Sequence, residues 1–198
     1  TALTTMSLSL WRRLLLTAAV SLSLPGCTGL AASLIGGALG GGDGSLFSAD
    51  DDPELVREAV PFGLKTMEAL ISSAPDDEEL LLSAASGFTQ YAYAFVQQDA
   101  ERLDEVDPEA SRAGLARAKK LYRRARDYGL RALAAEYDDD FRARLDSDRA
   151  ALLAEIDDED AVPYLYWTAA PWAALIALSK VDMNAVGDLP AVEALVAR

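Results

Sequence analysis

Two helical patterns on either side of one break, between Leu80 and Leu133, most constrain what this chain can fold into. Small and apolar residues recur at spacings of three and four on both sides of Asp107-Pro108, which places each set on one face of a helix. The sets are Leu81, Ala85, Phe88, Ala92 and Phe95, and then Leu115, Ala118, Tyr122, Ala125, Gly129 and Ala132. Because the link is short, the two helices are predicted to pair antiparallel.

The predicted pair combines small residues with aromatic ones. Residues 83–87 are Ser, Ala and Gly, which let a neighbouring backbone approach closely, and aromatic side chains follow further along. Ala118, Tyr122 and Ala125 fit the small–aromatic–small pattern of a tetratricopeptide unit, although the proline expected just after them is missing. The pattern predicts an all-α fold of tetratricopeptide-like antiparallel hairpins that form a bundle or superhelix.

The N-terminal segment has the features of a secretory leader. Arg12 and Arg13 precede an apolar run over 14–24, and Leu-Pro-Gly-Cys follows at 24–27. This order resembles a bacterial lipoprotein signal, which is cut before a cysteine that then carries lipid. We therefore predict a signal peptide over 1–26 and lipidation at Cys27.

Two other interpretations of this segment remain open. The uncharged run over 14–42 is long enough to span a bilayer, although Pro25 and the later glycines disfavour a continuous helix. The second alternative is that Cys27 is a buried thiol without a lipid. Under the lipoprotein interpretation, no aspartate follows the cysteine, and the resemblance to lipoprotein sorting signals then implies the outer membrane rather than the inner one.

The rest of the chain divides into a tether and a helical body. Residues 27–49 are rich in Gly, Ala and Ser, which predicts a flexible lipid-anchored tether. Asp52 and Pro53 form a helix-start signal, so the helical domain is predicted over 50–198. The last apolar stripe, with Val192, Leu195 and Val196 predicted inward, stops without a cap. We therefore expect this domain to be incomplete at its C-terminus.

Composition excludes several classes of function. The 18 basic and 32 acidic residues give a net charge of −14, which disfavours nucleic acid as a partner. Histidine is absent and cysteine occurs once, which removes the commonest general base and the usual zinc ligands. We therefore predict that the protein is not an enzyme and that it has no catalytic residues, no metal site and no cofactor. A carboxylate-based hydrolase is a less favoured alternative.

Positive charge concentrates in the second predicted helix, which carries Arg112, Arg117, Lys119, Lys120, Arg123, Arg124, Arg126 and Arg131. The simplest interpretation is a helix that lies against acidic neighbours and solvent. The functional interpretation is a docking face, or a cationic anchor for an anionic ligand.

Residues 162–179 are apolar nearly all round, which predicts the most buried helix, kinked near Pro171. Residues 181–189 are predicted to form a turn. The aromatic residues of the chain favour either a large aromatic core or an apolar cavity with a few polar tips. For a cavity, the candidate ligand-binding residues are Tyr91, Tyr128, Trp167 and Trp172, with Arg126 as an anion contact.

Five stretches together resemble a known family: DDPELVREAVPFGLKTMEAL, LLLSAASGFTQYAYAFVQQDAE, LYRRARDYGLRAL, VPYLYWTAAPWAALIALSK and DLPAVEALVAR. The chain resembles the T-component (TatT) family of TRAP transporters from about Asp51 to Arg198. GFTQYAYAFVQ and RARDYGLRAL are the most specific segments.

The resemblance implies a periplasm-facing helical lipoprotein that works beside the substrate-binding component of a TRAP transporter. It also implies a homotrimer as the assembly to test, and a tunnel for an apolar or amphipathic organic ligand. It carries no catalytic motif. The alternative is a tetratricopeptide-like scaffold with a solid core and no ligand cavity.

Overall fold

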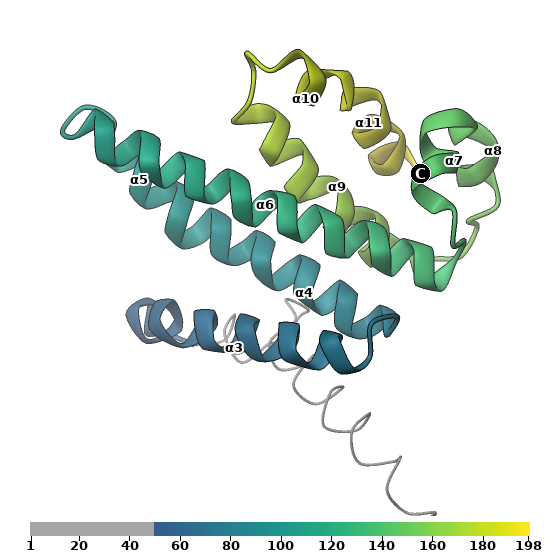
Figure 1. Cartoon of the computed structure of the whole chain (residues 1–198), viewed down its shortest axis with the longest axis horizontal. Coiled ribbons are helices and arrows are strands. Elements are labelled where there is room, and N and C mark those ends of the chain that lie inside the picture. Colours follow the sequence, from purple (N-terminus) through teal and green to yellow (C-terminus); the bar gives the residue numbers. More distant parts are fainter. Residues whose placement is uncertain (1–49) are drawn as a thin grey trace, which may run out of the picture.

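A computed structural model describes residues 50–198, and every regular element in that range is helical (Figure 1). The elements are α3 (Pro53–Ser73), α4 (Glu78–Tyr91), η1 (Ala92–Gln97), α5 (Gln98–Arg102), α6 (Pro108–Glu136), α7 (Phe141–Ser147), α8 (Arg149–Ala154), α9 (Ala161–Ala177), α10 (Met183–Gly187) and α11 (Leu189–Ala197). The prediction of an all-α fold is confirmed. The predicted signal peptide, tether and Cys27 lie outside the described residues.

Aspartates set the starts of the three helices that open the bundle. The carboxylate of Asp77 accepts a hydrogen bond from the backbone N–H of Leu80 at 2.9 Å, and that of Asp107 accepts one from Ala110 at 3.0 Å. Asp52 caps α3 in the same way. Each carboxylate satisfies N–H groups that have no partner inside the helix, so these helix starts follow directly from local sequence.

The helix from Glu78 to Arg102 is continuous but contains one wide turn. Over η1 the hydrogen bonding changes from the α to the π pattern, and the backbone N–H of Gln98 bonds to the carbonyl of Tyr93. A π turn inserts an extra residue and so rotates the side chains that follow it. The chain then turns at 103–107 and returns as α6.

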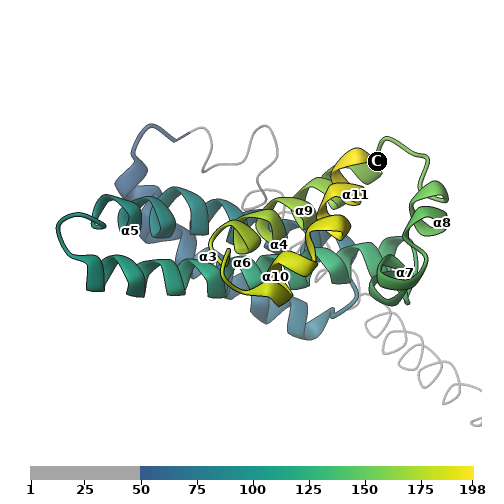
Figure 2. The same ribbon diagram turned by 90° about the horizontal axis from the view of Figure 1, so that it is seen from above.

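Helix α6 is the central element of the bundle, packed between α4 and α9, with α3 outside α4 and α11 against α9 (Figures 1 and 2). Its crossing with α9 is close. A Cβ at Gly129 would lie 2.4 Å from Thr168 Oγ1 and 2.9 Å from Thr168 Cα. Only a residue without a side chain lets the two helices approach this closely.

Two clusters of buried side chains form the core. One joins α3, α4, η1 and α6 around Met67, Phe88 and Tyr122. The other joins the end of α6 to α7, α8, α9 and α11 around Phe141 and Trp172. The hairpin of α4 and α6 is the one predicted, whereas a tetratricopeptide-like superhelix stays a prediction.

Three sequence predictions about the C-terminal helices are corrected. Residues 181–189 contain the short helix α10, which Asp182 caps by accepting from the N–H groups of Asn184 and Ala185. Helix α9 is not buried all round, because Tyr166 is 56% exposed. Val196 points outward, and Ala191 joins the core in its place. Helix α9 therefore has a surface face as well as a core face.

Candidate ligand site and basic face around helix α6

The five predicted ligand-binding residues do not share one site. Trp172 and Arg126 lie together beside α10, and Trp167 lies on the other side of α9. Tyr128 lines a hollow on the outer side of α6. Tyr91 is buried next to Arg117. The structure therefore separates the predicted set into several environments.

Trp167 lines a hollow of about 300 Å³, which we call the aromatic hollow. Its walls come from α4, η1, α6 and α9, and it is lined by Thr89, Gln90, Tyr93, Tyr122, Tyr166, Trp167, Ala170 and Ala174. The alanines leave space between the aromatic rings. The hollow thus offers apolar contact area with a few polar groups, the composition common to sites for small organic molecules.

The rings of the aromatic hollow are held at defined angles. Tyr166 and Trp167 meet edge to face, with ring centroids 4.9 Å apart. Tyr122 is buried, and its hydroxyl donates to Oε1 of Gln97 at 2.6 Å. Burial raises the pKa of Tyr122, so its hydroxyl stays a neutral donor. Tyr93 and Tyr166 are more than half exposed, which leaves ring surface available to a ligand.

Sequence reasoning missed Tyr93, Tyr122 and Tyr166 as lining residues of one site. Tyr93 falls within the π turn of η1, and its placement depends on that turn. Tyr166 was assigned to a buried helix because its neighbours in α9 are apolar. The signal available in the sequence was that η1, α6 and α9 each carry a tyrosine that lines this hollow.

Trp172 occupies a filled part of the core. It is 0% exposed, and its indole Nε1 donates to Oδ2 of Asp188 at 3.0 Å. The guanidinium carbons of Arg126 and Arg142 lie 5.5 Å and 4.6 Å from its ring centroid. These contacts satisfy the indole and cover its ring. A more polar hollow of about 260 Å³ lies beside it, between α6, α9 and α10.

The hydroxyls of Tyr91 and Tyr128 are engaged by neighbouring side chains. Tyr91 accepts from Nη2 of Arg117 at 3.3 Å. Tyr128 donates to Oε1 of Glu68 at 3.0 Å and stacks against Phe88 at 5.8 Å between ring centroids. Burial and the Glu68 charge raise the pKa of Tyr128 to about 12. Both residues are positioned by the bundle itself.

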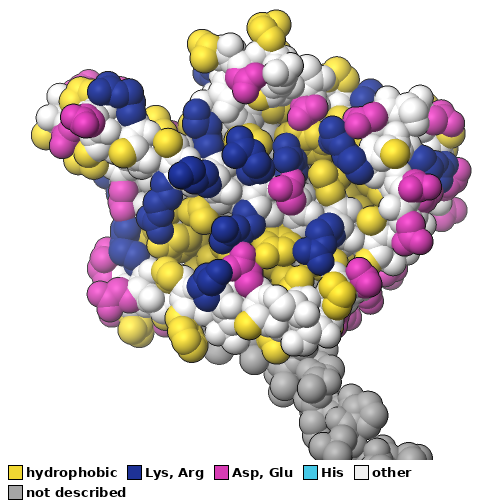
Figure 3. Space-filling model, viewed as in Figure 1, with side chains coloured by type: hydrophobic (Ala, Val, Ile, Leu, Met, Phe, Trp, Pro, Cys, Tyr) yellow, Lys and Arg dark blue, Asp and Glu magenta, His cyan; other side chains and the backbone are white. Residues whose placement is uncertain are grey.

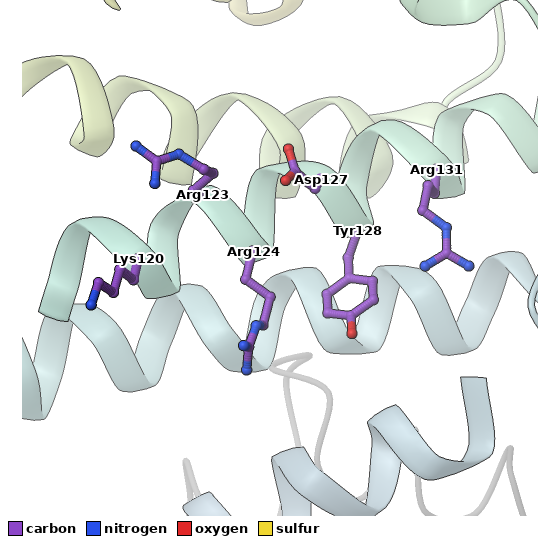
Figure 4. A pocket seen from close by; sticks show the side chains of 6 residues that line it. All are labelled: Lys120, Arg123, Arg124, Asp127, Tyr128 and Arg131. Carbon is purple, nitrogen blue, oxygen red and sulfur yellow. The ribbon is translucent and has the colours of Figure 1, made fainter. Parts of the chain in front are cut away.

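The outer side of α6 carries exposed basic residues, which we call the basic face: Lys120, Arg123, Arg124 and Arg131. With Asp127 and Tyr128 they line an open hollow of about 370 Å³. Basic side chains gather over α6, with hydrophobic surface between them (Figure 3). Arg124, Tyr128 and Arg131 project to one side of α6, and Arg123 and Asp127 to the other (Figure 4).

Comparison with known proteins identifies the family. The model of the family described as "TRAP transporter T-component" matches residues 49–198. The chain belongs to the TRAP transporter T-component family. A protein of Treponema pallidum (strain Nichols), described as an uncharacterized protein, is 34% identical over 139 residues. That match covers 69% of this chain and 43% of the relative, so the chain spans less than half of the relative's length.

The family assignment confirms the resemblance seen in the sequence, and it leaves the individual ligand-binding residues as predictions. Within residues 50–198, the acidic side chains form no group of three or more that could hold a metal ion. Across the same residues, no helix is both long and apolar enough to cross a membrane.

Proposed function

We propose that this protein is the accessory T-component of a TRAP-type transport system in the bacterial cell envelope. It associates with the transporter's substrate-binding component and holds a small apolar or amphipathic organic ligand in the aromatic hollow. The observation that carries the transport role is the family match over residues 49–198, which includes the whole described bundle. The ligand role rests on the chemistry of the hollow.

The lining of the aromatic hollow supports an amphipathic ligand. Tyr93, Tyr166 and Trp167 offer ring surface, while Thr89 and Gln90 supply polar groups at its wall. Aromatic rings bury large apolar areas, and their polar atoms orient a ligand that has one polar end. This chemistry supports a ligand site at Trp167 rather than at Trp172, whose ring is covered.

The proposed location follows from the leader. Cleavage before Cys27 and acylation of its thiol anchor the protein, and the tether of 27–49 places the bundle in the periplasm beside the outer membrane. Mass spectrometry of membrane-extracted protein tests this, because an acylated N-terminal Cys27 is the expected product. Recovery of an unmodified Cys27, or of an uncleaved leader, contradicts the lipid anchor.

Association with the substrate-binding component is tested with that component from the same transporter. Isothermal titration calorimetry of the two purified proteins is expected to show saturable binding. Sedimentation velocity of the T-component alone tests the homotrimer predicted from the resemblance. A complete lack of binding to the substrate-binding component contradicts the proposed transport partnership.

The ligand role is tested with palmitate as an amphipathic probe. Trp167→Ala removes ring surface from the hollow and is expected to weaken palmitate binding about tenfold, since one lost large side chain is worth about 1.4 kcal/mol or more. Phe62→Ala is the control, because Phe62 is an aromatic residue on α3 that is 78% exposed and outside the hollow. Equal binding by wild type, Trp167→Ala and Phe62→Ala contradicts this site.

The alternative function is a protein-interaction scaffold without a ligand. It is favoured by the filled surroundings of Trp172, and by the open form of the hollow on the basic face. Native mass spectrometry of the freshly purified protein separates the two. A bound small molecule supports ligand carriage, whereas a bare protein that still binds the substrate-binding component supports the scaffold.

A further inference from the structure

Helix α6 differs in charge from the rest of the protein. It carries eight basic residues and only three acidic ones, Glu109, Asp127 and Glu136, in a chain whose net charge is −14. The difference, 8 − 3, makes this single helix +5. Four of the eight basic residues form the basic face, while the buried residues of the helix pack against α4 and α9.

The charges of the basic face are only partly neutralised by the bundle. Arg124 forms an ion pair with Glu68 at 3.2 Å, while Asp127 is held by Arg126 at 2.7 Å. Lys120 and Arg123 make no ion pair or hydrogen bond with any side chain of the described region. The face therefore keeps unpaired positive charge directed outward.

Two arginines of the basic face are held in place before any partner arrives. The guanidinium of Arg124 lies 5.3 Å from the ring centroid of Phe88, and that of Arg131 lies 5.7 Å from that of Tyr128. Arg131 also donates to the carbonyl of Pro75 at 2.6 Å. Stacking and hydrogen bonding restrict these long side chains, so less conformational entropy is lost when they bind a partner.

The shape of the face favours a macromolecule over a small anion. All six residues that line its hollow belong to α6, so no second element closes over it. Small-ligand sites bury most of the ligand, which an open face cannot do. From Lys120 to Arg131 the helix extends about 16 Å, a length suited to a protein surface.

We infer that the basic face of α6 is the docking surface for an acidic patch on the substrate-binding component. This inference rests on the proposed transport partnership and adds the surface and its chemistry. Charge complementarity attracts the partner to this face, whereas the acidic remainder of the protein repels it from others. The hydrophobic surface between the arginines is then covered in the complex (Figure 3).

The test is calorimetric titration of the substrate-binding component against full-length wild type and two charge-reversal variants. Lys120→Glu/Arg123→Glu reverses the unpaired charges and is expected to weaken binding at least about tenfold at 50 mM NaCl. The control, Arg112→Glu/Lys180→Glu, makes the same change in net charge at two exposed residues outside the basic face. It is expected to bind within about twofold of wild type.

The dependence of affinity on salt concentration, and the affinity of a charge-neutral variant, provide two independent measurements. Wild-type affinity is expected to fall about tenfold between 50 and 300 mM NaCl, and that fall is smaller in the reversal variant. Lys120→Gln/Arg123→Gln is expected to show an intermediate loss. Since these residues are exposed, all variants should keep the wild-type helical circular dichroism, which verifies folding.

The possible outcomes distinguish a failure of the proposed docking surface from a failure of the proposed transport partnership. If the substrate-binding component binds wild type, Lys120→Glu/Arg123→Glu and Arg112→Glu/Lys180→Glu equally well, the basic face is not the docking surface, although the partnership stands. If wild type does not bind, the partnership and this inference both fail. A third outcome is that 10 mM inorganic phosphate or phosphatidylglycerol vesicles bind the basic face to saturation without changing the partner's affinity. That result assigns the face to a small anion or a membrane, and it overturns the proposal.

Discussion

Trp167 and Trp172 lie on the same helix, five residues apart, yet their surroundings are opposite in kind. Five residues rotate a helix by about 140°, so the two indoles leave α9 on different sides. Trp167 lines the aromatic hollow with three tyrosines. Trp172 is completely buried, with its Nε1 bonded to Asp188 and its ring covered by Arg126 and Arg142.

The difference shows how one helix divides a filled core from a hollow. Between the two tryptophans, Thr168 faces Gly129 of α6 at the point of closest approach. Around Trp172, helices α7, α8 and α11 add further side chains and close the core. Around Trp167, alanines and the wide turn of η1 leave space. Trp172 is therefore expected to govern stability, and Trp167 ligand binding.

The largest expected effect comes from exchanging the tryptophans one at a time for alanine. Trp172→Ala leaves a large void in a packed core, and is expected to lower the free energy of unfolding by about 3–5 kcal/mol. Trp167→Ala removes a partly exposed ring beside an existing hollow, and is expected to cost about 1 kcal/mol. Urea unfolding followed by circular dichroism measures both. Equal losses would remove the distinction between the two sites.

The next effect concerns the close approach between the two tryptophans. Gly129→Ala places a Cβ 2.9 Å from the backbone Cα of Thr168, whose hydroxyl is already bonded to the carbonyl of Tyr164. The helices must move apart, at an expected loss of about 1–3 kcal/mol. Thermal and urea unfolding provide the measurement.

Gly187→Ala is the matched control for this substitution. A Cβ at Gly187 meets no heavy atom within 4 Å, so no loss of stability is expected. If Gly129→Ala is as stable as Gly187→Ala, then α6 and α9 are free to separate slightly. The shape of the aromatic hollow would then not depend on this contact.

Much of the bundle could be predicted from sequence because local signals determine it. The caps at Asp52 and Asp107 and the apolar spacing in α4 and α6 identified the helices and their pairing. The π turn of η1 and the short helix α10 were not predicted. The π turn depends on how neighbouring helices pack, which a local pattern does not contain. Helix α10 has a local start signal in the Asp182 cap, and that signal was missed.

The candidate site was harder to predict than the fold. Composition drew attention to the aromatic residues, but it could not distinguish a ring that fills space from one that borders a hollow. Trp172 became a core residue because Arg142 and Asp188 come from distant elements to cover it. Tyr93 entered the hollow through the turn of η1. Residue type indicates the chemistry of a site, while packing decides its location.

A smaller, pH-dependent effect is expected on the Trp172 side, through Arg144. This arginine forms ion pairs with Asp138 and with Glu155, the latter at 2.6 Å. Its hydrogen bonds hold the pKa of Asp138 and Glu155 below their ordinary values of 3.8 and 4.5. Carboxylates with lowered pKa stabilise the folded state above those ordinary values, and the stabilisation is lost as the pH falls through the folded-state pKa values.

Arg144→Met tests this contribution. At pH 7 the variant is expected to be less stable than wild type, and the difference should shrink steadily from about pH 4.5 downward, as both carboxylates become protonated. Urea unfolding at pH 7, 5, 4 and 3 supplies the comparison. A difference that stays constant over this range means that Arg144 acts through packing rather than through its ion pairs.

The last comparison is spectroscopic and examines the two indoles directly. In Trp11→Phe/Trp172→Phe only Trp167 emits, and in Trp11→Phe/Trp167→Phe only Trp172 emits. Acrylamide is expected to quench Trp167 several times more efficiently, because Trp172 is 0% exposed. Palmitate should then shift the emission of Trp167 and protect it from acrylamide while leaving Trp172 unaffected. A response from Trp172 alone would place the ligand beside α10, near Arg126 and Asp188, and would reverse the roles assigned to the two sides of α9.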